Sequence, residues 1–423
     1  MKKVTKLLLA LSMVGIFAST TFSEISFGAW GRGIFSPLTS NHKEEIVPNN
    51  GVSWGGRSAR IGWSIRGNSD NVGFQVDMNS DLRSIGFQDQ QKIWVKLFDM
   101  LTVEVGPSIF YGALRGDAAF GVWNYMRFSG QDDEDAIFAR GKAGMGDQWY
   151  HRQNGNGIQG GWGKEPIFGG ALAHLDVAGF HAFISLDQST GSKIGDTLSE
   201  SYSSAIMFKR GQYGLGYEIP NFGLVRAQYI GKAYLPSDTE DLNDVIENKE
   251  LANYGIIQAA LKVDKIVENL YIDVGASFAT EKQSKTGDNY GYNSFGGYVK
   301  YGLEKVTLHA MGKFKLKMKA KENKDDTELK EGTGIHAGVG ADINVGGITI
   351  NGDVRIFNNF WTNNPDGNHS VGFLAGVSKG FSNGRIAAGF EFITAGTINA
   401  GLGEKQNTDD PMWALPIIFE YWF

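Results

Sequence analysis

Hydrophobic and polar residues alternate one by one over many short stretches of this chain. In the run from Ala59 to Arg66, every second residue is apolar, and a tight turn at 68–71 leads into a second such run from Val72 to Asn79. Successive side chains of a β-strand point to opposite faces, so these runs predict strands with one apolar and one polar face. Clear runs recur at 270–278, 306–318, 335–343 and 348–356, and weaker ones at 91–98, 101–106, 170–177, 180–187, 254–263, 293–301, 370–379 and 384–393.

The links between these strands alternate in length. Short links lie at 68–71, 98–100, 178–179, 220–222, 264–269, 302–304, 345–346 and 380–383. Long polar links lie at 36–56, 80–90, 107–169, 188–202, 232–253, 280–292, 320–333, 358–369 and 394–412. The alternation is unbroken if 203–219 is one long strand, which gives about 18 strands, with 16 to 20 still open.

This pattern predicts an all-β fold, a transmembrane antiparallel up-and-down β-barrel. A soluble β-sandwich would also show alternation, but it would not need short links at one end and long links at the other. In a membrane barrel the periplasmic turns are short and the outer loops are long, and closure leaves no unpaired strand edge in hydrocarbon. A barrel of this size leaves an aqueous lumen.

The first residues have the pattern of a secretory signal peptide. Three lysines, at positions 2, 3 and 6, precede an apolar run from Leu7 to Ala18, which is too short for a membrane-spanning helix of about 20 residues. We expect residues 1–23 to be removed and 24–423 to form a single barrel, although cleavage a few residues earlier is also open. The chain contains no cysteine, so it has neither disulfides nor a lipid attached to cysteine.

The last strand carries the most specific motif of the chain. Counting back from the carboxy-terminus, apolar side chains share one face: Trp413, Leu415, Ile417, Phe419, Tyr421 and Phe423. This resembles the closing strand of bacterial outer-membrane β-barrels. The resemblance implies that Leu415, Ile417, Phe419, Tyr421 and Phe423 act as an assembly signal, with the barrel-assembly machinery, periplasmic chaperones and outer-membrane lipid as partners and the outer membrane as location.

Composition agrees with a barrel and excludes several other classes. Aromatic residues make up 12% of the chain and glycine contributes 58 of 423 residues, about twice its average share. After the signal sequence there is no apolar run of the roughly 18 residues that a membrane helix needs. The formal net charge of −6 and the lack of a basic tail argue against nucleic acid as a partner.

Strand parity places many charged side chains on the inward face. The predicted basic wall of the lumen consists of Arg60, Arg66, Lys92, Lys96, Lys313, Lys315, Lys317 and Arg355. Inward acids include Asp77, Glu104, Asp176, Asp187, Asp273, Asp342, Asp353 and Glu391. A charge on the lipid face would cost roughly 2–4 kcal/mol at the midplane, which supports the inward placement. Two roles for these inward charges are open: they select among solutes, or they only solvate a water-filled interior.

The link 107–169 is the third long one and far longer than the others. A structureless link of this length is uncommon unless it has a function. Its acids are Asp132, Asp133, Glu134 and Asp135. In position, length and acidity this loop is similar to the third outer loop of general and substrate-specific porins, which folds into the lumen. The resemblance implies that these four acids face the basic wall at a constriction, while a solvated loop tip is the alternative.

Two functions follow from these patterns. The first is an outer-membrane porin that lets ions and small polar solutes diffuse through a water-filled barrel. The alternative is a surface adhesin or abundant coat barrel whose loops bind external ligands. We expect no enzyme, no cofactor and no metal site: none of the seven histidines has the spacing to Ser that outer-membrane phospholipases use, and one His-Asp pair on a face, His174 with Asp176, is expected by chance. Homotrimers are common among porins, but no feature of the sequence shows one.

Overall fold

The computed structural model describes most strands and short turns of the chain. The described residues are 24–40, 46–49, 59–80, 85–109, 111, 113–114, 170–187, 208, 211–231, 255–279, 293–320, 326–328, 330–358, 360, 369–394, 396–399, 405–408 and 411–423. The expected signal segment 1–23 and the acids at 132–135 lie outside them. Within these residues, no helix has both the length and the apolar character needed to cross a membrane.

The described residues form 21 β-strands. In chain order they are β1 (Glu24–Ser40), β2 (Ile46–Asn49), β3 (Ala59–Asn68), β4 (Val72–Ser80), β5 (Ile85–Leu97), β6 (Leu101–Ser108), β7 (Gly170–Val177), β8 (Phe180–Asp187), β9 (Gln212–Ile219), β10 (Gly223–Gly231), β11 (Gly255–Val263), β12 (Leu270–Ala279), β13 (Ser294–Gly302), β14 (Val306–Ala320), β15 (Lys330–Val345), β16 (Ile348–Phe357), β17 (Ser370–Phe381), β18 (Gly384–Ile393), β19 (Gly396–Asn399), β20 (Lys405–Thr408) and β21 (Met412–Trp422).

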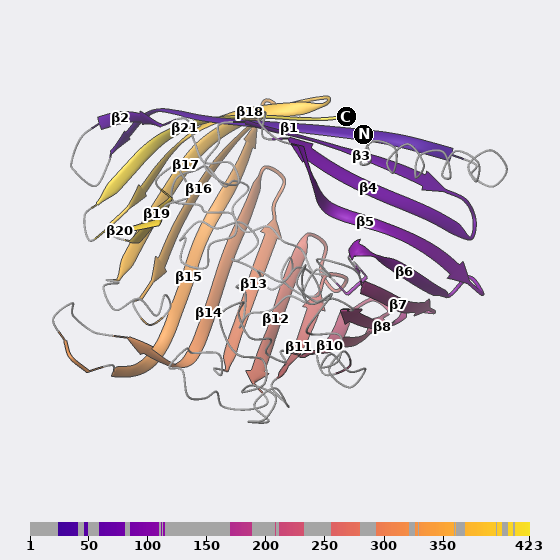
Figure 1. Ribbon diagram of the computed structural model, residues 1–423. Coiled ribbons are helices and arrows are strands. Elements are labelled where there is room, and N and C mark those ends of the chain that lie inside the picture. The colour runs from indigo at the N-terminus through magenta and orange to yellow at the C-terminus, as the bar shows by residue number, and fades with distance from the viewer. Residues whose placement is uncertain are drawn as a thin grey trace, which may run out of the picture.

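Eighteen of these strands close into one antiparallel barrel, as the link pattern predicted. Neighbours along the chain pair in turn, and β1 completes the circle because it pairs with both β3 and β21. At this seam Trp30 lies opposite Gly62 on one side and Trp422 on the other. The amide of Phe423 donates to the carbonyl of Ala29 at 2.7 Å, and Figure 1 shows β21 running alongside β1.

The short links form tight turns that all lie at one end of the barrel, which we call the short-turn rim. Here several described residues other than glycine have left-handed backbone: Phe98, Asp99, Ala178, Asn221 and Asn269. The turn between β15 and β16 places Gly346 and Gly347 at φ 57° and 78°, where glycine has no Cβ penalty. At the same rim Lys265 donates to Glu218 at 2.7 Å, and this contact raises the pKa of the lysine ammonium group.

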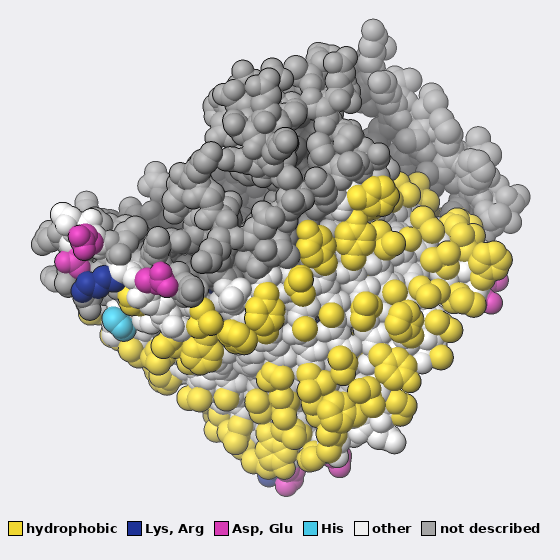
Figure 2. All heavy atoms as spheres, turned by 90° about the horizontal axis from the view of Figure 1, so that it is seen from below, with side chains coloured by type: hydrophobic (Ala, Val, Ile, Leu, Met, Phe, Trp, Pro, Cys, Tyr) yellow, Lys and Arg dark blue, Asp and Glu magenta, His cyan; other side chains and the backbone are white. Residues whose placement is uncertain are grey.

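The two faces of the wall differ as strand parity predicted. On β17, Val371 and Phe373 are exposed on the outer face, whereas Ser370 and Leu374 are buried on the inner face. On β14 the lysines 313 and 315 are on the inner face and Phe314 between them is on the outer face. Figure 2 shows one side of this outer wall, where hydrophobic side chains spread over the surface and charged ones stand at its margins.

The structure differs from the prediction at several strand ends. Of the strand expected over 203–219, the structure describes β9 from Gln212 on, and before it the amide of Gly211 donates to the carbonyl of Phe208 at 3.1 Å. At the other rim, β1 continues to Ser40 and pairs with β2, within the link expected at 36–56. The pair β19–β20 lies within the link expected at 394–412. Polar strand extensions beyond the apolar belt carry no alternation, so the pattern could not reveal them.

Candidate functional site

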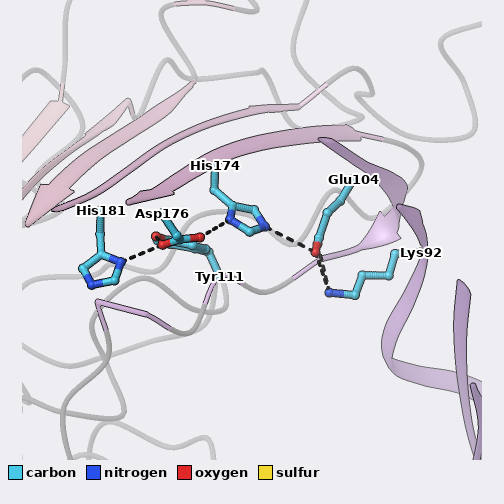
Figure 3. Close-up of polar contacts among 6 residues, drawn as sticks. All are labelled: Lys92, Glu104, Tyr111, His174, Asp176 and His181. Atoms are coloured by element: carbon cyan, nitrogen blue, oxygen red, sulfur yellow. Dashed lines mark hydrogen bonds and ion pairs between the residues drawn. The ribbon is translucent and has the colours of Figure 1, made fainter. Parts of the chain in front are cut away.

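The candidate site is the inner wall of the barrel. It carries two separate polar networks, one on β5 to β8 and the other on β10 to β16. Figure 3 shows the first network, on β5 to β8. Lys92 donates to Glu104 at 2.9 Å, and His174 Nε2 lies 3.7 Å from the same carboxylate. Asp176 Oδ2 lies 2.6 Å from His174 Nδ1, and Asp176 Oδ1 lies 2.6 Å from His181 Nδ1. The pair that the sequence analysis treated as a chance neighbour, His174 with Asp176, is therefore part of a larger cluster.

Strand register explains why these side chains meet. Asp176 and His181 are direct partners across the β7–β8 hairpin, and their side chains point to the same inner face. His174 stands two residues before Asp176 on β7, so it shares that face. An ionised carboxylate only accepts hydrogen bonds, so both imidazoles donate through Nδ1–H.

Part of the long third link lies inside the barrel. Ile109, Tyr111, Ala113 and Leu114, which we call the anchor segment, follow β6 and pack against the inner wall. Leu114 is fully buried and Tyr111 is 5% exposed, in one cluster with the inward-facing side chains of Leu172, Phe183, Leu224 and Ala260. A Cβ at Gly216 would overlap the end of the Leu114 side chain, so glycine at this position leaves room for it. The expected entry of this loop into the lumen holds for the anchor segment.

The second network lies on β10 to β16. His309 links Tyr298 and Asp342, with its Nδ1 at 2.8 Å from the tyrosine hydroxyl and its Nε2 at 2.8 Å from the carboxylate. Arg226 donates to both oxygens of Asp273 at 2.7 Å. Tyr298, His309 and Asp342 come from the adjacent strands β13, β14 and β15, whereas Arg226 on β10 reaches Asp273 on β12 across β11. All of these side chains are almost fully buried. Buried charges are costly unless they are paired, and these pairs satisfy that requirement within the wall.

The predicted basic wall is not uniform. Lys92 pairs with Glu104, and Arg355 donates to Asp353 at 3.1 Å. Lys313 and Lys315 are only 1% and 2% exposed on the inner face. Lys96 is partly exposed and lies 3.9 Å from Asp99.

For some of the remaining predicted residues the structure gives only their position on a strand. Arg66 is exposed on β3 and faces Ser26 of β1 across the strand pair. Arg60 and Lys317 lie in β3 and β14, but their side chains are outside the described set, as are the four acids of 132–135. The five residues of the proposed assembly signal all lie on β21 or directly after it, with Phe419, Tyr421 and Phe423 exposed on the outer face.

Sequence reasoning missed the anchor segment and its partners. The available signal was the presence of apolar residues on both faces of one strand. Leu172, Phe183 and Leu224 lie at inward positions of strands whose outward positions are also apolar. Among the residues that the structure describes, no group of three or more His, Asp or Glu side chains is arranged to hold a metal ion.

The comparisons with known proteins give structural likeness only. No protein-family model matches the chain, and no curated protein matches it. A solved porin structure is 11% identical over 95% of this chain and 100% of its own, with a TM-score of 0.44. OccK5 (OpdH) of Pseudomonas aeruginosa is 10% identical over 95% of this chain and 99% of its own, with a TM-score of 0.48. The trimer form of OmpT of Vibrio cholerae is 13% identical over 95% and 99%, with a TM-score of 0.44. Likenesses this distant do not carry a function from one protein to another.

Proposed function

We propose that this protein is an outer-membrane channel through which ions and small polar solutes diffuse passively. The observation that carries the proposal is the closed cylinder itself, with apolar side chains outside and charged or polar side chains inside. An apolar outer belt is suited to lipid, and closure satisfies the backbone groups that hydrocarbon cannot. Eighteen strands enclose a space too wide for the side chains of the wall to fill alone.

The proposal assigns the short-turn rim to the periplasm and the long links to the cell exterior, as is general for bacterial barrels. It also assigns charge preference to the basic wall and narrowing of the lumen to the long third link. The anchor segment supports the narrowing, because it occupies the interior beside β7 to β11. Opposition between the acids of 132–135 and the basic wall is part of the proposal.

The basic residues differ in how they can act. Lys92 and Arg355 are neutralised locally by Glu104 and Asp353, so a passing ion meets pairs of charges there. Lys313 and Lys315 are two further positive charges on the inner face of β14, and the proposal includes them in the charge preference of the basic wall. We propose no catalytic role for the His174–Asp176–His181 cluster and no cofactor.

Planar-bilayer recording of the purified full chain tests the proposal. We expect discrete conductance steps, and uptake into vesicles of uncharged sugars that falls with sugar size. A correctly folded barrel that produces no steps and admits no sugar would contradict the channel and favour the surface-binding alternative. The homotrimer stays a prediction, which chemical cross-linking of the detergent-solubilised protein tests.

A further inference from the structure

The anchor segment runs a long way down the inside of the wall. β6 meets β7 at the long-link end of the barrel, where Gly106 lies opposite Gly170. Asp176 stands near the other end of β7, roughly 20 Å further along at about 3.3 Å per residue. Tyr111 follows β6 closely in sequence, yet its hydroxyl donates to Asp176 Oδ1 at 2.5 Å. The segment has therefore left the wall after β6 and descended toward the short-turn rim.

Apolar packing alone does not fix this depth. Tyr111 and Leu114 contact side chains from several strands, and such non-directional contacts tolerate sliding along the wall. A hydrogen bond to an ionised group is directional and about twice as strong as a neutral one. The Tyr111–Asp176 bond is thus the directional contact that acts on the depth of the segment, beside the space that Gly216 leaves for Leu114.

Asp176 is also held in place by side chains other than Tyr111. Its two oxygens accept from His174 on its own strand and from His181 on the next strand. His174 is in turn oriented by Glu104 and Lys92, from β6 and β5 (Figure 3). Three donors from three places in the chain, Tyr111, His174 and His181, thus converge on one carboxylate, whose position is fixed by the wall.

We propose that Asp176 is a positioning residue that latches the anchor segment inside the barrel through the Tyr111 hydroxyl. For the channel the consequence rests on the function proposed above: the latch keeps the start of the third link at a fixed depth, so the open lumen keeps one size. Without the latch, the segment slides or leaves the wall, and the lumen varies in width.

The test uses the absence of cysteine in the natural chain. A single reporter, A113C, sits in the anchor segment, where Ala113 is partly buried. Its labelling by a membrane-impermeant maleimide is compared in the natural background and with Tyr111→Phe, which removes only the hydroxyl and keeps the ring that lies 4.7 Å from the His174 ring. We expect labelling to become about 10- to 100-fold faster, the factor expected for losing a hydrogen bond to a charged group.

Two controls separate the latch from general loosening. Tyr213→Phe removes a hydroxyl that donates to the Phe208 carbonyl outside the cluster, and it should leave labelling of A113C unchanged. A reporter on the inner face of β17, S378C, should label equally in both backgrounds. Asp176→Ala should release the segment too, and adding Tyr111→Phe to it should have little further effect, because Asp176→Ala already removes the acceptor of that bond.

Equal labelling of A113C with and without the Tyr111 hydroxyl overturns the latch, whether or not the barrel conducts. In bilayers, the latch predicts a broader spread of conductance levels for Tyr111→Phe than for the natural chain. A natural chain that never conducts contradicts the proposed function, while the labelling rates still decide whether the latch exists. Similar effects at A113C and S378C would also overturn it, since they indicate global loosening.

Discussion

The seam between the first and last strands gives the sharpest prediction for stability. Glu420 on β21 accepts from Arg32 on β1 and from Arg385 on β18, the latter at 2.5 Å between Nη2 and Oε2. One carboxylate thereby joins both neighbours of the closing strand. Glu420→Gln keeps the size of the side chain but removes the charge that two guanidinium groups share.

The expected loss follows from burial. Removing one partner of a buried ion pair costs about 3–5 kcal/mol. The Glu420 and Arg32 side chains are 10% and 12% exposed, and Arg385 is 23% exposed, so solvent screens part of this interaction. We therefore expect the free energy of unfolding to fall by about 2–3 kcal/mol in E420Q.

Urea unfolding of the barrel in lipid vesicles, followed by tryptophan fluorescence, measures this loss. Trp30 and Trp422 are direct partners across the seam, so two of the ten tryptophans of the chain lie in the region that changes. Glu304→Gln, at an exposed glutamate in the turn between β13 and β14, serves as the matched control and should change stability by less than about 0.5 kcal/mol. If E420Q and E304Q unfold at the same urea concentration, the seam does not depend on this charge and the reasoning is wrong.

Three further predictions concern the wall and the terminal strand. Lys313→Glu combined with Lys315→Glu should shift ion preference toward cations, because two positive charges become negative; an unchanged reversal potential contradicts the basic wall. Val339→Arg places a charge on the outer face of β15, where Val339 is 60% exposed, and should reduce the free energy of folding into vesicles by about 2–4 kcal/mol, whereas V339A should not. Phe423→Ala removes a side chain that is 76% exposed, so stability in vitro should change little while the assembled yield in cells falls; equal yield would refute its role as an assembly signal.

The barrel itself could be predicted from the sequence because two solvents impose one rule on every strand. Oil outside and water inside force alternation, so runs such as 270–278 and 348–356 appear directly as strands. The same rule placed Lys313, Asp273 and Arg355 on the inner face, where the structure has them. A charged side chain on the lipid face costs free energy, so the sequence pattern predicts that charged residues lie on the inner face.

The pairing within the candidate site could not be predicted in the same way. Which inward charges meet depends on strand register, and alternation shows parity but not the partner across a hairpin. The anchor segment breaks the rule altogether. Leu172 and Phe183 are apolar on the inner face because Tyr111 and Leu114 cover them, so β7 and β8 lost the contrast between faces and gave only weak strand signals.

The tight turns of the short-turn rim have a consequence for how this protein can change. Backbone conformations fixed at Ala178, Asn221 and Asn269 lock each hairpin in register from that end. Insertions and deletions at the opposite end therefore need not shift the cross-strand partners below them. The strands and the short-turn rim must stay constant, whereas the long links can vary. The long links are therefore suitable places to graft new recognition sequences without redesigning the wall.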